Sequence, residues 1–107
     1  MTGVTTHVLN TSRGLPASGV RVRLESQSND GGWKALGSGV TNSDGRANLA
    51  PEGVAEGVYR ITFDTAVYMP DGLYPEVAIT FNVRDTARHY HIPLLVSPYG
   101  YTTYRGT

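Results

Sequence analysis

Apolar and polar residues alternate along several stretches of this chain. Residues 20–25 alternate valine or leucine with arginine or glutamate at every step, and residues 59–64 and 77–83 keep the same period of two. Successive side chains of a β-strand point to opposite faces of the sheet, so each stretch predicts a strand with one buried face. The apolar member of each pair is therefore expected in the core.

Glycine, asparagine, aspartate and proline gather between these stretches and predict tight turns. Residues 42–45, Asn-Ser-Asp-Gly, contain an Asp-Gly pair that is typical of a hairpin turn. One short helix is expected near residues 65–68, with Asp64 as its N-cap. The pattern as a whole predicts one all-β domain, residues 1–107, folded as a two-sheet β-sandwich of about eight strands. These strands are expected near residues 4–10, 20–26, 33–41, 46–49, 57–64, 75–84, 87–95 and 99–105.

Composition excludes several classes of function. Nine basic residues balance nine acidic ones, so no basic surface for nucleic acid is expected. No stretch approaches the roughly 20 apolar residues of a membrane span. The chain has no cysteine, which excludes disulfides and thiolate metal sites and favours a reducing compartment. Because residues 1–10 also lack the pattern of a signal peptide, we expect a cytoplasmic protein.

The end of the chain carries unusual chemistry. The apolar segment 92–96 is followed closely by Tyr104-Arg105-Gly106-Thr107, which offers a guanidinium, a hydroxyl and a terminal carboxylate. Chain ends usually fray and carry no function, and Arg105 could simply pair with a neighbouring carboxylate. We nevertheless expect this ending to form part of a site.

Two signatures relate the chain to a known family. Residues 7–22 read His-Val-Leu-Asn followed by Gly-Leu-Pro-Ala and an alternating strand, and residues 90–102 read Tyr-His-Ile-Pro-Leu-Leu-Val-Ser-Pro-Tyr-Gly-Tyr-Thr. Together they resemble the transthyretin-related family over essentially the whole chain. The hormone-carrying branch has lysine where His7 stands and lacks a histidine like His91. The chain is therefore more similar to the 5-hydroxyisourate hydrolase branch.

The resemblance implies an enzyme that opens the ring of 5-hydroxyisourate during urate degradation, giving 2-oxo-4-hydroxy-4-carboxy-5-ureidoimidazoline without a metal or other cofactor. It also implies a transthyretin-like fold and a homotetramer, a dimer of dimers with active sites in the channel between dimers. The chain departs from the family at its last residue, where threonine replaces the usual serine. The catalytic positions implied are His7, Arg46, His91 and Thr107, and the substrate-binding positions are Arg46, Tyr104, Arg105 and Gly106.

These residue types suit the implied reaction. Imidazole has an ordinary pKa of about 6.5, so His7 or His91 can activate water near neutral pH, and the sequence leaves open which of them is the base. The planar guanidinium of Arg46 matches the oxygens of a urate-like anion and can stabilise developing negative charge. His89 shares a face with His91 by the period of two, but we expect it to be structural or exposed. His7, His89 and His91 form only a weak metal-binding pattern.

The same residues bear on assembly and on alternative functions. Residues 92–101 are rich in apolar side chains, including Leu94, Leu95, Val96 and Tyr99, and an exposed apolar patch of this kind predicts a subunit interface. One alternative function is a carrier of small aromatic ligands in the same channel, and another is a structural or adhesion module without a site. The combination of two histidines, Arg46 and a polar ending favours the hydrolase.

Overall fold

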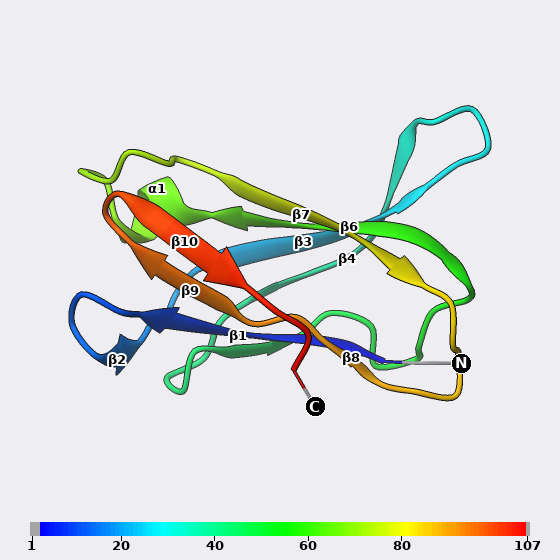
Figure 1. Ribbon diagram of the computed structural model, residues 1–107, viewed down its shortest axis with the longest axis horizontal. Helices are drawn as coiled ribbons and strands as arrows, with labels where there is room; N and C mark the ends of the chain where they lie inside the picture. The colour runs from blue at the N-terminus through cyan, green and yellow to red at the C-terminus, as the bar shows by residue number, and fades with distance from the viewer. Residues whose placement is uncertain (1–2, 107) are drawn as a thin grey trace.

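Ten strands of the part of the chain that the structure describes, residues 3–106, form two sheets that pack face to face in the computed structural model (Figure 1). This confirms the predicted two-sheet sandwich. A four-residue helix, α1 (Thr65–Tyr68), follows the third strand of the second sheet. The first sheet contains β1 (Val4–Asn10), β2 (Leu15–Pro16), β5 (Arg46–Asn48), β8 (Tyr90–His91), β9 (Leu94–Ser97) and β10 (Gly100–Thr103). The second contains β3 (Arg21–Gln27), β4 (Trp33–Val40), β6 (Gly57–Asp64) and β7 (Val77–Val83).

Strand β1 organises the first sheet. It pairs antiparallel with β2 and β5 and parallel with β8 and β9. Strand β10 continues the sheet beyond β9. Segments from the beginning, middle and end of the sequence therefore meet on a single strand, which is how the fold brings distant residues together.

The core lies between the two sheets. Residues predicted to point inward, such as Val22, Leu24, Ile61 and Phe63, are fully buried. Strand β1 alternates strictly, with Val4 and its even-numbered successors buried and the odd-numbered residues half-buried. Full burial of a valine side chain contributes roughly 1.5–3 kcal/mol to folding, so the even positions of β1 are needed for stability. The odd positions, which are only half-buried, are free to carry functional side chains.

Three local predictions need correction. The expected strand 87–95 is two strands, because Pro93 has no N–H to donate and separates β8 from β9. The turn at residues 42–45 joins β4 to β5, which belong to different sheets, so it is not the turn of a β-hairpin. Asp64 precedes the helix as predicted, but its side chain makes no capping hydrogen bond.

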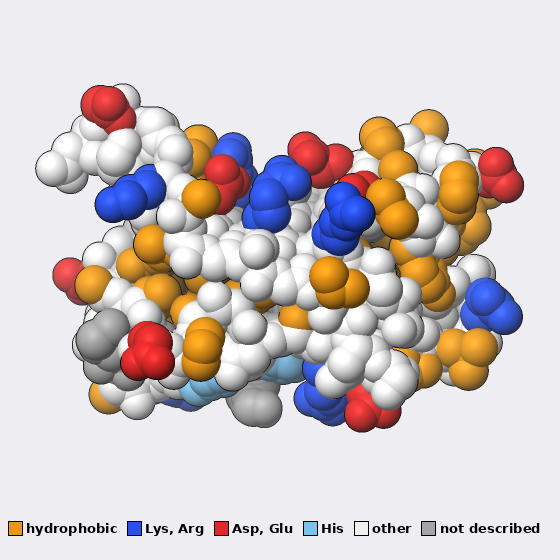
Figure 2. Space-filling model, turned by 180° about the vertical axis from the view of Figure 1, so that it is seen from behind, with side chains coloured by type: hydrophobic (Ala, Val, Ile, Leu, Met, Phe, Trp, Pro, Cys, Tyr) orange, Lys and Arg blue, Asp and Glu red, His pale blue; other side chains and the backbone are white. Residues whose placement is uncertain are grey.

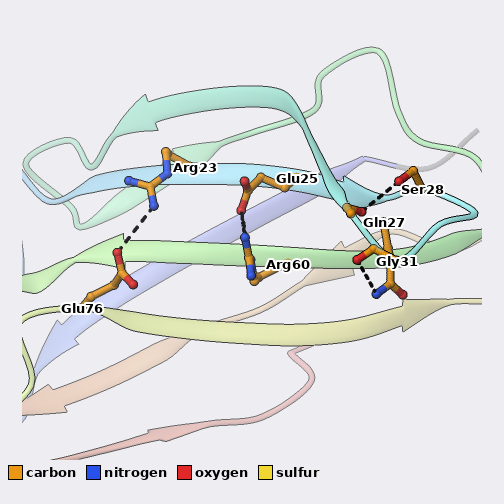
Figure 3. A network of polar contacts seen from close by, with 8 residues as sticks. Arg23, Glu25, Gln27, Ser28, Gly31, Arg60 and Glu76 are labelled. Carbon is orange, nitrogen blue, oxygen red and sulfur yellow. Dashed lines mark hydrogen bonds and ion pairs between the residues drawn. The ribbon is translucent and has the colours of Figure 1, made fainter.

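The outer face of the second sheet carries paired charges (Figure 3). Arg60 donates from Nε and Nη2 to Glu25 Oε1 at 3.0 and 2.8 Å, and its guanidinium lies 4.2 Å from the centre of the Trp33 ring. Arg23 and Glu76 approach to 3.5 Å at an exposed position. Exposed pairs of this kind add little stability, and this face has no histidine.

Exposed apolar side chains lie on and beside β10, and others lie on β2, β4 and α1. Leu94 and Val96 are buried within the single chain, so only part of the segment 92–101 can contribute to a subunit interface. Tyr99 and Tyr101 remain exposed, and Tyr101 packs edge-on against Tyr74 with ring centres 5.4 Å apart.

None of the helices described between residues 3 and 106 has the length and apolar character needed to cross a membrane.

Candidate active site

The outward-facing positions of β1 lie between two strands that supply the candidate catalytic residues. His7 is the register partner of Arg46 on β5, and Thr5 is the partner of Asn48 on the same strand. On the other side, Thr5 is the register partner of His91 on β8. Opposed residues of neighbouring strands place their side chains on the same face, so His7, Arg46 and His91 share the outer surface of the first sheet.

This surface is hollowed. A cavity of about 430 Å³ opens here, and Figure 2 shows the histidine side chains gathered at the lower margin of the molecule with basic side chains beside them. His7 is not among the lining residues, but it stands opposite Arg46, which is one of them. The cavity is lined by Thr5, Thr6, Asn42, Arg46, Ala47, Asn48, His89 and His91.

The turn before β5 holds Arg46 in place. Asn42 Oδ1 accepts hydrogen bonds from the backbone N–H groups of Asp44 and Arg46 at 2.9 and 3.0 Å. Gly45 has a φ of +79°, and a Cβ at this position would lie 2.4 Å from the carbonyl oxygen of Val8. Gly45 of the Asp-Gly pair is therefore needed both for the left-handed turn and for its close approach to β1.

A backbone contact determines the tautomer of His7. Its Nε2 lies 2.8 Å from the carbonyl oxygen of Asp44. A carbonyl can only accept, so His7 Nε2 carries the proton and donates it. The Nδ1 atom of a neutral His7 is then the nitrogen that is free to accept.

His91 is held by side-chain and backbone contacts. Its Nδ1 lies 2.8 Å from the Thr5 hydroxyl, and its carbonyl oxygen accepts a 2.8 Å hydrogen bond from the N–H of Gly106. A Cβ at position 106 would lie 2.5 Å from His91 Cδ2 and 3.3 Å from Pro93 Cγ. Gly106 therefore fits closely beside the imidazole ring, where a larger residue would displace it.

The electrostatics of the cavity favour a neutral His91. Partial burial lowers the pKa of His91, and the charges of Arg46, His7 and His89 lower the pKa further. A histidine that stays neutral near neutral pH has a free nitrogen lone pair. His91 is therefore able to take a proton from water at the site.

The predicted site residues at the end of the chain lie in two different parts of the molecule. Tyr104 and Arg105 line a second cavity of about 280 Å³ beside β7, and the Arg105 guanidinium lies 4.3 Å from the centre of the Tyr90 ring. Gly106 lies beside His91 instead. Thr107 lies outside the described residues.

His89 is one of several residues of the cavity that were not predicted to belong to the site. His89 is exposed, as expected, but its Nε2 lies 2.7 Å from the Thr5 hydroxyl and its ring lines the cavity with His91. The sequence did indicate that His89 and His91 share a face. It did not show that Thr5 lies between them and contacts both rings. In residues 3–106, no three histidine, cysteine, aspartate or glutamate side chains are grouped so as to hold a metal ion.

Comparisons with known sequences point to one family. Residues 4–106 match the model of the HIUase/Transthyretin family. The chain is 46% identical over 107 residues to the 5-hydroxyisourate hydrolase of Salmonella typhimurium, covering 94% of this chain and 78% of that protein. It is 40% identical over 119 residues to the uric acid degradation bifunctional protein TTL of Arabidopsis thaliana, covering 97% of this chain but 37% of that protein.

Solved structures of two kinds share the fold. The Klebsiella pneumoniae 5-hydroxyisourate hydrolase superposes with a TM-score of 0.86 at 31% identity, covering 99% of this chain and 100% of that chain. Sea bream transthyretin in complex with thyroxine superposes with a TM-score of 0.90 at 29% identity, covering 97% and 94%. Backbone similarity alone therefore does not distinguish a hydrolase from a carrier, and the side chains of the site must do so.

Proposed function

The chain belongs to the HIUase/transthyretin family, and we propose on that premise that it hydrolyses 5-hydroxyisourate in urate degradation. One observation carries the proposal: His7, Arg46 and His91 share one face of β1 and its neighbours, and Arg46 and His91 line one cavity on that face. A site of this composition offers a proton acceptor, a proton donor and a cation for an anionic substrate. The sequence identity to the Salmonella hydrolase supports the same reading.

We propose that His91 is the base. It removes a proton from a water molecule through Nε2, the nitrogen that Thr5 leaves free, and the resulting hydroxide attacks the ring carbonyl carbon. The ring C–N bond then breaks, and the proton passes from His91 to the leaving nitrogen. Two observations favour His91 over His7 as the base: the pKa of His91 is lowered, and His7 Nε2 is occupied by its hydrogen bond to the Asp44 carbonyl.

Arg46 is proposed to bind the substrate and to stabilise the oxyanion that forms during attack. Its backbone is fixed by the Asn42 turn, while its side chain is exposed toward the cavity. A guanidinium donates from a planar fork and keeps its charge at any relevant pH. Gly106 stays in the proposal as the wall beside His91, and Thr107 stays a prediction.

Tyr104 and Arg105 have a different place in the proposal. Both line the second cavity of the same chain, and Arg105 stacks on Tyr90. We therefore assign them no contact with a substrate held at His91 of their own chain. Their expected role in substrate binding is retained only for a site completed by a second subunit.

A homotetramer, a dimer of dimers, is proposed for the assembly. The exposed tyrosines Tyr99, Tyr101 and Tyr104 on and beside β10 support it, and among residues 3–106 β10 is an edge strand of its sheet. Exposed aromatic groups and a free strand edge favour association. Sedimentation equilibrium at micromolar concentration should give four times the mass of the chain, and a clean monomer would refute the assembly.

The competing function is a carrier of small aromatic ligands, which the similarity to the thyroxine complex of sea bream transthyretin favours. The two functions differ in one direct measurement. Freshly generated 5-hydroxyisourate should lose its ultraviolet absorbance faster with catalytic amounts of the protein than without it. A carrier would instead slow the change only at concentrations comparable to those of the compound, which would contradict the hydrolase.

A further inference from the structure

The hydroxyl of Thr5 connects two histidines. Its Oγ1 lies 2.7 Å from His89 Nε2 and 2.8 Å from His91 Nδ1. Thr5 points out of the sheet between the two rings, because it stands at an odd position of β1 opposite His91 on β8. Both distances are those of normal hydrogen bonds, so the three side chains form a continuous polar chain.

The number of available protons restricts the directions of the hydrogen bonds that link His91, Thr5 and His89. A hydroxyl has one proton to donate and two lone pairs to accept with, so at least one of the two ring nitrogens must carry its own proton. In one arrangement, His91 donates from Nδ1 to Thr5, and Thr5 donates to His89 Nε2. Shifting two protons along the chain gives the reverse arrangement, in which His89 donates and His91 accepts.

We propose that Thr5 and His89 form a proton relay behind His91, an inference that rests on the proposed hydrolysis. As His91 Nε2 takes a proton from the attacking water, the Nδ1 proton passes to Thr5 Oγ1 and the Thr5 hydroxyl proton passes to His89 Nε2. When His91 Nε2 protonates the leaving ring nitrogen, both protons return. The balance closes, because the water loses one proton, the ring nitrogen gains one and the hydroxide stays on the carbonyl carbon.

The surroundings of His91 explain why moving a proton to His89 would help the reaction. His91 is half-buried, with Arg46 on β5 and His7 on β1 as its charged or titratable neighbours besides His89, and these surroundings lower the pKa of His91. An imidazolium at this position is therefore disfavoured. His89 is exposed to water, where a positive charge is hydrated at little cost. The relay moves the charge from the cavity toward solvent during the attack.

Removing the hydroxyl tests the relay. Thr5→Val keeps the shape and should lower kcat about tenfold or more with little change in KM, because it removes part of the roughly hundredfold that a positioned proton acceptor contributes. Thr5→Ser restores a hydroxyl and should recover most of that loss. Thr80→Val, the same exchange on the other sheet, is the control and should behave as the unchanged protein. The relay is overturned if Thr5→Val keeps full turnover or if Thr5→Ser loses as much.

A second variant separates hydrogen bonding from proton transfer. Glutamine can place an amide nitrogen or oxygen near the position of His89 Nε2, yet it cannot take up a proton. His89→Gln should therefore lower kcat about tenfold, and imidazole buffer should restore turnover in proportion to its concentration. A structural role for His89 would give no response to buffer, and that result would also overturn the relay.

A measurement without substrate keeps the relay and the proposed function apart. The ¹⁵N chemical shifts of both imidazole rings report which nitrogens carry protons, and they should change together in Thr5→Val but not in Thr5→Ser. Normal hydrolysis with unchanged ring shifts in Thr5→Val would overturn the relay alone. Coupled shifts in a protein that does not hydrolyse 5-hydroxyisourate would overturn the proposed function.

Discussion

His7 and Arg46 stand directly opposite each other on the antiparallel strands β1 and β5, on the face that turns away from the core. Residues in this relation have Cβ atoms about 4.5–5.5 Å apart. A substrate anion held by the guanidinium would therefore also be within reach of the imidazole. The register of two strands, which backbone hydrogen bonds determine, thus sets the spacing of two groups of the site.

The Arg46→Lys variant should lose activity despite keeping its charge. Lysine provides a point charge where arginine offers a planar fork of donors, so a two-point contact with the substrate is lost. We expect kcat/KM to fall at least about tenfold, a loss of about 1.4 kcal/mol of transition-state stabilisation. Steady-state kinetics on 5-hydroxyisourate measure it, and near-native activity would make Arg46 an ordinary solvated turn residue.

The His7→Asn and His91→Asn variants should each lower turnover by at least about a hundredfold, the usual contribution of general acid–base groups. Neither side chain is part of the core, so thermal unfolding should change little. His89→Asn should cost less, about tenfold, because the proposed relay places His89 behind His91 and not at the attacking water. Equal losses at all three positions would show that the roles of the histidines are wrongly assigned.

The Gly106→Ala variant should impair the site without unfolding the protein. The added Cβ would lie 2.5 Å from His91 Cδ2, so the imidazole must move, and a misplacement of about 1 Å can cost about a hundredfold in rate. Gly100→Ala is the control, because its Cβ would meet only Ser97 Oγ at 3.8 Å. Similar kinetics for the two variants would argue against a tight fit of Gly106 beside His91.

The pH dependence follows from the lowered pKa of His91. The folded chain binds this proton less tightly than the unfolded chain, so this group's contribution to stability falls as pH drops below the ordinary value of about 6.5. Activity that needs neutral His91 should likewise persist below pH 6.5 and fall only at more acid pH. Titrating the His91 ring by NMR, with Arg46→Gln as comparison, should show the pKa rising when the guanidinium is removed. An unchanged pKa would mean that Arg46 does not act on His91.

The strands in which apolar and polar residues alternate could be predicted from the sequence. Val22, Leu24, Ile61 and Phe63 are buried as their period of two predicted, because one buried face is a local property of each strand. The break at Pro93 was missed, because the apolar run on either side of it reads as one strand. Which strands pair is a non-local property, so the position of β5 beside β1 could not be read from a turn signal.

The same distinction applies to the site. His7, Arg46 and His91 were named from a resemblance to a family, and only the pairing of β1 with β5 and β8 places them on a common face. Thr5 was not considered, because a lone threonine in a strand carries no signal of its own. Arg105 stays a predicted substrate-binding residue, and within this chain it stacks on Tyr90. That contact could not be read from the sequence, because residues 90 and 105 are distant along the chain.

The alternation of β1 has a consequence for how such a protein can change over time. Val4 and Val8 are fully buried in the core, while Thr5 and His7, one residue away, lie on the outer face of the sheet. Substitutions at the second pair leave the buried surface almost untouched. Side chains on this face can therefore be exchanged at little cost in folding free energy, which makes one scaffold compatible with both a hydrolase and a thyroxine-binding protein. Laboratory evolution of new specificities should accordingly begin at the odd positions of β1 and at their partners on β5 and β8.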